Sequence, residues 1–342
     1  MLWRGTLLLL VGQIVFLVCG YGINVVLARL LDPEGYGTFG VVYSILMIFE
    51  LFVVAGIPNA LQRFVGENPD RAYVLHKVML RGQLVYTVSV FVLAIIAAPA
   101  IAKFLQDRQL AAILQIAAID ILFFSFYWYY NGLQIGLKNF GKQAVIASTY
   151  SLTKFGFIFF LVDAGFSVRG AFVGNLLGSI CGLVLGIWFL RLRKQDANYS
   201  QKDVTQFIVA NILYTIGLNL FFYIDLWFVK YHLSESTVGH YNAASTLCRI
   251  PYFFSIALSG ALLPSLSSAI AQSRTHEVER LIRQSLRLII LLVLPTMVVV
   301  ATTALPVVLL LFGEKYTGAA TIAQRLIVGM TFFTVFTVTN TI

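Results

Sequence analysis

Long apolar stretches, separated by short polar segments, follow one another along the whole chain. A helix needs about 20 predominantly apolar residues to cross a bilayer. Ten stretches meet this requirement: residues 5–28, 35–62, 82–102, 109–137, 143–162, 170–190, 204–229, 236–273, 288–313 and 316–342. The alternation of apolar and polar residues that is typical of membrane-spanning strands is absent from the sequence. The pattern therefore predicts an all-α, polytopic membrane protein.

Composition agrees with this class. Hydrophobic side chains make up 59% of the chain and charged ones only 11%, whereas soluble domains have about 45–50% and 25%. The loops are short, and the longest, residues 62–81, is expected to contain a helix that lies in the membrane interface. Because no large external loop could carry catalytic carboxylates, a membrane glycan polymerase or ligase is disfavoured, and we expect a protein that is not an enzyme.

The net charge of +9 is informative because the Lys and Arg residues are unevenly distributed among the segments between the spans. Between the apolar stretches, 15 Lys and Arg residues fall on one side of the membrane and six on the other, if the spans alternate in direction. Because cytoplasmic loops carry the excess of Lys and Arg, the N-terminus is predicted to be cytoplasmic in the cell membrane. In so apolar a chain the positive charge indicates membrane topology, and no nucleic-acid partner is expected.

Metal and cofactor chemistry has little support in the sequence. The three cysteines, Cys19, Cys181 and Cys248, lie inside apolar stretches, and the four histidines show no metal-ligand spacing. Glycine loops of the phosphate-binding type are also missing. We therefore expect no metal and no cofactor.

An internal repeat divides the chain. Residues 31–37 read Leu-Asp-Pro-Glu-Gly-Tyr-Gly and are followed by Ala-Gly-Ile-Pro at 55–58. Residues 233–241, Leu-Ser-Glu-Ser-Thr-Val-Gly-His-Tyr, and Gly-Ala-Leu-Leu-Pro at 260–264 echo them at an offset of about 202 to 206 residues. Since six predicted spans lie within this offset, the repeat is parallel, as in transporters whose halves are related by an axis along the membrane normal.

These turns resemble those of the polysaccharide-biosynthesis or oligosaccharide flippases (Wzx-type) of the multidrug, oligosaccharidyl-lipid and polysaccharide exporter superfamily. The resemblance implies two six-helix lobes around a central cavity that opens alternately to each side of the membrane. We expect the first lobe at 1–195 and a second, truncated lobe of four spans at 196–342. The chain ends within its tenth apolar stretch, which indicates a fragment; a complete ten-span variant is the alternative.

Polar residues recur at helical spacing within several spans. In the fourth span they fall on one narrow face: Asp120, Tyr127, Asn131, Gln134 and Lys138. Asn24 belongs to a similar stripe in the first span, as do Asn219 and Asp225 in the seventh. We interpret the stripes as the wall of a hydrated cavity, and hydrogen bonds between helices are the alternative.

The candidate binding residues follow from these stripes and from the charges within the spans. Lys154 and Arg249 are the leading contacts for an anionic head group, and Arg63 and Lys138 are expected at the cytoplasmic mouth. Asn24 and Gln134 complete the predicted substrate site, and Asp225 with Asn219 is the predicted coupling site for Na⁺ or H⁺. The alternatives are structural ion pairs of Lys154 with Asp120 or Glu50, and of Arg249 with Asp225.

The most favoured function is a flippase that transfers a polyprenyl-diphosphate-linked oligosaccharide across the membrane by alternating access. Its partners would be this glycan lipid, the coupling ion and the surrounding membrane lipid. A multidrug or organic-cation exporter of the same superfamily is the alternative. It would favour acidic and aromatic residues such as Glu50, Asp120 and Tyr127 over the two cations.

Overall fold

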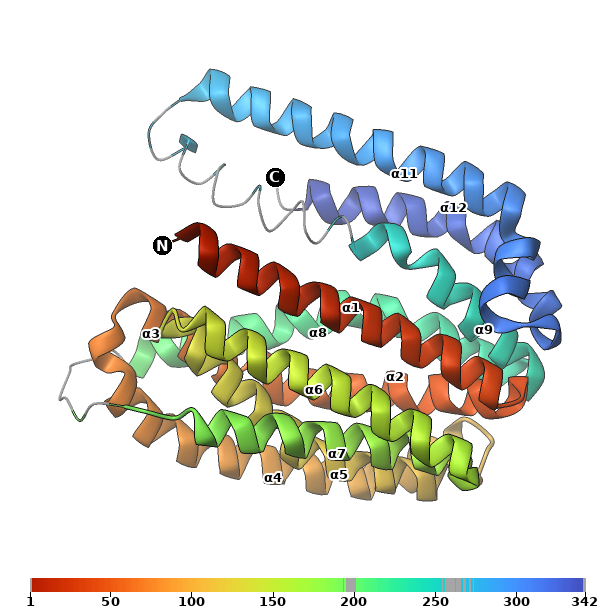
Figure 1. The fold of residues 1–342 in the computed structure, drawn as a ribbon, viewed down its shortest axis with the longest axis horizontal. Coiled ribbons are helices and arrows are strands. Elements are labelled where there is room, and N and C mark those ends of the chain that lie inside the picture. Colours follow the sequence, from red (N-terminus) through yellow and green to blue (C-terminus); the bar gives the residue numbers. More distant parts are fainter. Residues whose placement is uncertain are drawn as a thin grey trace. The chain divides into compact units, whose positions relative to one another are not determined.

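The computed structural model of the protein describes residues 2–192, 194, 201–253, 255, 262, 266, 269, 270, 272 and 274–340, with side chains from residue 12 onward. All regular structure in these ranges is helical, as Figure 1 shows. The longer helices are α1 (Leu2–Leu30), α2 (Pro33–Ala55), α3 (Ile57–Glu67), α4 (Ala72–Phe104), α5 (Gln109–Gly136), α6 (Phe140–Leu161), α7 (Ser167–Trp188), α8 (Gln201–His232), α9 (Glu235–Cys248), α11 (Thr275–Phe312) and α12 (Thr317–Thr339).

Eight stretches of the described residues are helical, long and apolar enough to cross a membrane. One of them, Phe140–Trp188, contains both α6 and α7, which reverse direction at a turn where Gly165 has a φ of 91°. Glycine adopts this backbone conformation without the steric cost that other residues meet. Apolar helices of sufficient length thus occupy nine of the ten expected spans, and the remaining one, 236–273, starts as α9 and continues largely outside the described residues.

The chain divides into two compact units, Met1–Glu235 and Ser236–Ile342. The first unit includes α8, which packs against α2 and α3. The expected division at residue 195 assigns α8 to the second lobe, so the lobe boundary stays a prediction. In the second unit, α11 packs along α12, with Ile289, Val293 and Val338 buried between them.

The start of α2 shows how the first of the repeated turns begins a new helix. Asp32 caps this helix by accepting a hydrogen bond from the Gly35 backbone N–H at 2.7 Å, and Pro33 occupies the first turn. The equivalent helix, α9, begins at Glu235, which lies 202 residues after Pro33. The offset of the sequence repeat is thus reproduced in the helix boundaries.

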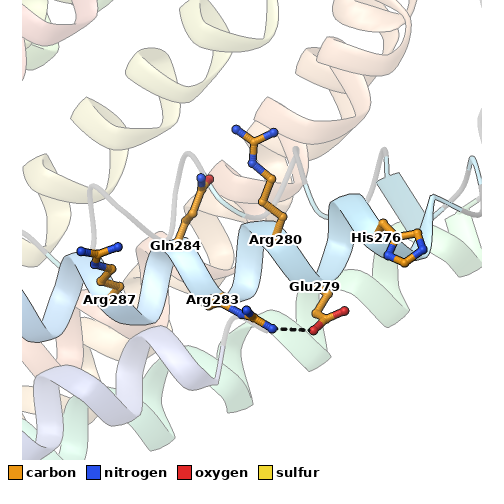
Figure 2. A pocket seen from close by; sticks show the side chains of 6 residues that line it. All are labelled: His276, Glu279, Arg280, Arg283, Gln284 and Arg287. Atoms are coloured by element: carbon orange, nitrogen blue, oxygen red, sulfur yellow. Dashed lines mark hydrogen bonds and ion pairs between the residues drawn. The ribbon is translucent and has the colours of Figure 1, made fainter.

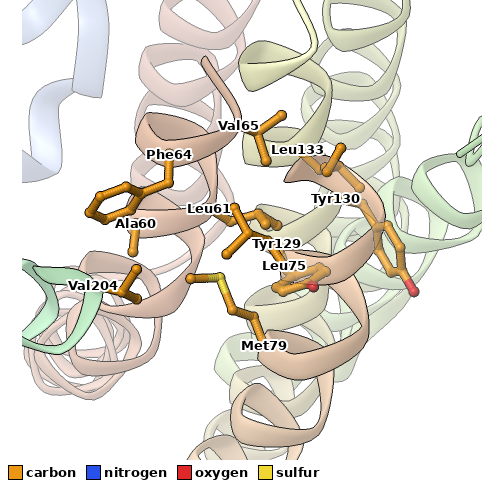
Figure 3. Packing of buried hydrophobic residues seen from close by; sticks show 11 residues of the cluster. Ala60, Leu61, Phe64, Val65, Leu75, Met79, Tyr129, Tyr130, Leu133 and Val204 are labelled. Atoms are coloured by element: carbon orange, nitrogen blue, oxygen red, sulfur yellow. The ribbon is translucent and has the colours of Figure 1, made fainter. Parts of the chain in front are cut away.

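One hydrophobic cluster holds together the end of the first unit where α3, α4 and α8 begin. Leu61, Leu75, Tyr129 and Leu133 are fully buried, and Val204 brings the start of α8 into the same cluster (Figure 3). The expected interfacial helix in 62–81 is wrong, because α3 ends at Glu67 and the later residues form the first turns of α4. Burying Leu75 against α5 stabilises this continuation of α4.

Glycines allow α7 to approach α5 and α6 closely. Four of them are spaced four residues apart along α7: Gly174, Gly178, Gly182 and Gly186. A β-carbon at any of these positions would lie 2.6–2.7 Å from an atom of α5 or α6. Small residues at this spacing let membrane helices pack with their backbones in near contact. This packing sets the position of the polar side chains described next.

Candidate functional site

A cluster of polar residues from four helices lies buried inside the first unit. It contains Glu50 of α2, Asp120 of α5, Lys154 of α6, and Asn175 and Ser179 of α7. Glu50 is 2% exposed, and Asp120 and Ser179 are fully buried. Charged side chains at membrane depth are costly to bury and usually have a functional or pairing role. This cluster is therefore the leading candidate site of the described chain.

Hydrogen bonds connect the acidic residues to α7. The Asn175 side-chain amide donates to the Asp120 carboxylate, and the Ser179 hydroxyl lies beside the same group. Glu50 and Asp120 are close enough to interact directly. One oxygen each of Glu50, Asp120 and Asn175 has no hydrogen-bond partner among the described residues. The cluster therefore retains unused acceptor oxygens in a buried position.

Lys154 lies at the edge of this cluster and is half-buried. Its Nζ donates to the Tyr150 hydroxyl at 3.3 Å and lies 5.3 Å from the Tyr43 ring centre and 5.5 Å from that of Tyr150. Within the described residues it makes no ion pair shorter than 4.0 Å with Glu50 or Asp120, although both carboxylates attract it electrostatically. The direct ion pair considered from the sequence is replaced by cation–π contacts.

The balance of charge determines what this cluster can do. Two carboxylates and one ammonium leave one negative charge in excess when all three are ionised. A buried charge without a counterion is strongly unfavourable, so this state would take up a proton or another cation. The half-buried ammonium can also bind an anion by charge-assisted hydrogen bonds. The site thus combines a cation-accepting interior with a cationic edge.

The polar stripe of α5 packs inside the unit. Asp120, Asn131 and Gln134 are at most 2% exposed, so the stripe expected to line an open cavity is enclosed by neighbouring helices. Gln134 donates to the Phe189 carbonyl oxygen at 3.3 Å and accepts from the Asn139 side chain at 3.0 Å. In this arrangement Gln134 joins the ends of α5 and α7, and its substrate-binding role stays a prediction.

Asn24 also makes local contacts. Its amide donates to the Gly20 carbonyl oxygen at 2.9 Å, and its side-chain oxygen accepts from the Tyr36 hydroxyl at 3.0 Å. This second bond joins α1 to the start of α2. Asn24 is therefore partly used in packing the two helices.

Arg63 and Lys138 are exposed and do not join the buried cluster. Arg63 forms an ion pair with Glu67 at 3.0 Å, and its guanidinium lies 4.7 Å from the Phe207 ring centre on α8. Lys138 follows α5 in the turn to α6, with a φ of 59°. In Figure 1 this turn and α3 lie at the same end of the first unit, as expected for two residues on one membrane face.

The predicted coupling residues lie on α8. The Asn219 side chain donates to the Thr215 carbonyl oxygen of its own helix at 2.8 Å, and Asp225 accepts from the Leu226 backbone N–H at 2.7 Å. Arg249 follows α9 and belongs to the second unit. The pairing of Arg249 with Asp225 therefore stays a prediction.

Sequence reasoning missed Asn175, Ser179 and Tyr43. Asn175 and Ser179 lie one helical turn apart in a span without charged residues, and such a pair is a weak signal beside the glycines of α7. Tyr43 is one of many aromatic residues, and nothing in its local sequence indicates a contact with Lys154. Only the packing of α2 against the other helices identifies it.

Comparison with models of protein families shows the family of this chain. The model of the polysaccharide biosynthesis protein family matches residues 2–270. The chain belongs to this family. The MatE family model matches residues 208–342, so the second part of the chain is also similar to that family. The family suggested by the repeated turns is thereby confirmed.

Individual relatives of this polysaccharide biosynthesis family member are distant. The probable low-salt glycan biosynthesis flippase Agl15 of Haloferax volcanii is 21% identical over 186 residues, covering 54% of this chain and 39% of its own length. The lipid II flippase MurJ has a similar fold, with a TM-score of 0.73, 16% identity and coverage of 97% of this chain and 74% of that chain. A multidrug resistance MATE transporter in an inward-facing conformation gives a TM-score of 0.71, 14% identity and coverage of 97% and 82%.

These likenesses confirm the all-α fold class, since the chain folds like both solved transporters. The chain spans at most 62% of the length of the curated relatives that it matches. The matches show the family and the fold, and the activity and substrate of the whole protein are proposals.

Proposed function

We propose that the protein moves a lipid-linked oligosaccharide, carried on a polyprenyl diphosphate, from the cytoplasmic to the outer leaflet of the cell membrane by alternating access. The observation that carries this proposal is the match of residues 2–270 to the polysaccharide biosynthesis family. The name of the archaeal glycan flippase and the fold of the lipid II flippase support it. The excess of Lys and Arg on one side supports a cytoplasmic N-terminus.

Lys154 supplies the chemistry that an anionic substrate needs. Its ammonium lies near the Tyr43 and Tyr150 rings and is hydrogen-bonded to the Tyr150 hydroxyl, so it is oriented before a ligand arrives. Glu50 and Asp120 offset its charge at longer range without contacting it. A diphosphate could then accept charge-assisted hydrogen bonds directly from the Lys154 ammonium. These bonds would replace its weaker, long-range attraction to the two carboxylates. Arg249 would act in the same way from the second unit, with Arg63 and Lys138 meeting the substrate first.

Ion coupling is the second part of the proposal. The buried pair of Glu50 and Asp120 is suited to accept a proton, because it carries more negative charge than Lys154 offsets. Asp225, with Asn219 one and a half turns earlier on α8, is the candidate for Na⁺ or H⁺ proposed from the sequence. Binding of either ion would change the charge of a membrane-embedded helix and so bias the two conformations.

An exporter of organic cations is the second candidate. The MatE match at residues 208–342 and the similarity to the MATE transporter favour it. A cationic drug would bind the acidic residues of the cluster and the neighbouring aromatic rings of Tyr43, Tyr127 and Tyr150. Lys154 would then oppose binding.

Transport by the complete gene product in proteoliposomes separates the two candidates. We expect translocation of a fluorescent polyprenyl-diphosphate oligosaccharide, and its loss in Lys154→Ala and Arg249→Ala at normal protein abundance. Arg249→Lys should retain part of the activity, because lysine lacks the bidentate fork of arginine. The exposed Lys103 at the end of α4 provides the control Lys103→Ala. Efflux of ethidium that survives in the cation variants, without any glycan translocation, would support the exporter instead.

A further inference from the structure

The side of α4 that faces away from the bundle is apolar along most of its length and basic at its start. Seven residues lie within an arc of about 100°: Val74, Lys77, Val78, Arg81, Val85, Val88 and Val92. Val85 is 69% exposed and Val92 44%, and Lys77 and Arg81 are also exposed. In a membrane helix such a surface contacts acyl chains along its length and head groups at its end.

The basic start of α4 borders a surface hollow. Its volume is about 480 Å³, and it is lined by Tyr73, Val74, Lys77, Val78, Arg81 and Lys194. Three of these six residues are cations, and the described part of the lining contains no carboxylate. Lys77, Arg81 and Lys194 make no ion pair with another described residue. The hollow therefore has the charge and the donors to receive an anion.

The second unit repeats this arrangement on α11. Arg280 and Arg287 lie near the start of this helix and border a hollow of about 390 Å³, together with His276, Glu279, Arg283 and Gln284 (Figure 2). Arg283 is paired with Glu279 at 2.7 Å, whereas Arg280 and Arg287 on the same side of the helix make no ion pair with another described residue. Farther along this side of α11, three large apolar residues are exposed: Leu291 at 64%, Leu294 at 46% and Val298 at 54%.

The two basic surfaces are related by the internal repeat. Arg280 lies 203 residues after Lys77, and Arg287 lies 206 residues after Arg81. The repeated turns at the starts of α2 and α9 have an offset of 202 residues. Lys77 and Arg81 are four residues apart and Arg280 and Arg287 are seven apart, so the two helices share cations near their starts and an exposed apolar side but not the spacing of the cations.

We propose that each unit binds the phosphate head group of an anionic membrane phospholipid at these basic surfaces, with its acyl chains along the exposed apolar side of α4 or α11. Cations at the end of a membrane helix attract anionic lipid head groups, and lysine and arginine donate charge-assisted hydrogen bonds to phosphate. A soluble anion would use the cations alone, whereas a phospholipid also covers the adjoining apolar side. The proposal does not depend on which solute the protein transports.

Native mass spectrometry of the complete gene product, released from nanodiscs of mixed phosphatidylglycerol and phosphatidylcholine, tests this proposal. We expect two retained phosphatidylglycerol molecules. Lys77→Gln with Arg81→Gln should lose one of them, Arg280→Gln with Arg287→Gln should lose the other, and the four substitutions together should lose both. Lys103→Gln with Arg108→Gln removes the same charge at the opposite end of α4 and should retain both lipids.

Three results would overturn the proposal. The first is unchanged retention in the variant with four substitutions, and the second is equal retention of phosphatidylcholine. The third is displacement of the bound lipid by an equimolar polyprenyl diphosphate, which would assign the surfaces to a transported substrate. Thermal unfolding of each variant in detergent checks that the fold is intact. Because these residues are exposed, we expect unfolding temperatures close to that of the unmodified protein.

Discussion

A β-carbon on Gly178 would lie 2.6 Å from the β-carbon of Lys154. The Lys154 Cα and backbone N would be 2.9 and 3.1 Å away, so the contact involves backbone that cannot move aside as a flexible side chain could. The position of the only cation in the buried cluster of the described first unit is therefore set by a glycine on the neighbouring helix. Helix packing and the charge arrangement of the site are physically connected here.

Gly178→Ala should destabilise the protein and displace Lys154. Overpacking of this kind costs about 1–3 kcal/mol, and thermal unfolding in detergent measures it. Gly156→Ala is the matched control on α6, because no atom lies within 4 Å of a β-carbon built there. Equal unfolding temperatures for the two variants would contradict the close contact of α6 and α7.

Neutralising Lys154 alone should reduce the abundance of the folded protein more than neutralising it together with an acidic neighbour. Lys154→Met leaves the Glu50 and Asp120 carboxylates without the cation that attracts them, and a buried charge that loses its compensation destabilises the fold. Adding Glu50→Gln should restore abundance in the membrane. If the double variant folds but translocates no glycan, Lys154 has a role in transport as well. No recovery of abundance would argue against electrostatic coupling between the two residues.

The ion pair between Lys230 and Asp107 should be important for holding α8 in the first unit. The Nζ of Lys230 lies 2.8 Å from the Asp107 carboxylate, and the lysine side chain is only 5% exposed. Lys230→Gln should lower the unfolding temperature. Arg283→Gln should have little effect, since its pair with Glu279 is 79% and 66% exposed and such surface pairs contribute about 0–1 kcal/mol. Equal effects of the two substitutions would contradict this ranking.

The two ends of α8 should lie on opposite sides of the membrane. Lys202 and Leu233 are exposed at these ends, so single cysteines there should react differently with an impermeant maleimide. The background would replace Cys19, Cys181 and Cys248. We expect labelling of Leu233→Cys from outside intact cells and labelling of Lys202→Cys only after permeabilisation. The reverse pattern would show that the N-terminus is external.

Replacing Asp225 tests the coupling site proposed from the sequence. Asp225→Asn removes the charge and keeps the size of the side chain, so transport should lose its dependence on a Na⁺ or H⁺ gradient. Asp163→Asn, in the exposed turn between α6 and α7, is the control. Full gradient dependence in Asp225→Asn would leave Glu50 and Asp120 as the coupling candidates, and Glu50→Gln would be examined in the same assay.

The sequence was sufficient for the helices and for their succession. The length of each apolar stretch is a local property, so nine spans, the helix start at Pro33 and its repeat at Glu235 could all be recognised from residues close together in the chain. The same holds for the class of the fold, because a chain this apolar has few alternatives in a membrane.

Only the tertiary structure decided which polar residues meet. The contact of Asp120 with Asn175, the position of Lys154 near two tyrosine rings and the packing of α8 in the first unit depend on how each helix is rotated about its axis. That rotation is set by long-range packing, here by the glycines of α7, and helical periodicity alone does not contain it. Helical periodicity placed Asp120 and Gln134 on one face of α5. Neighbouring helices bury that face, so it does not line an open cavity.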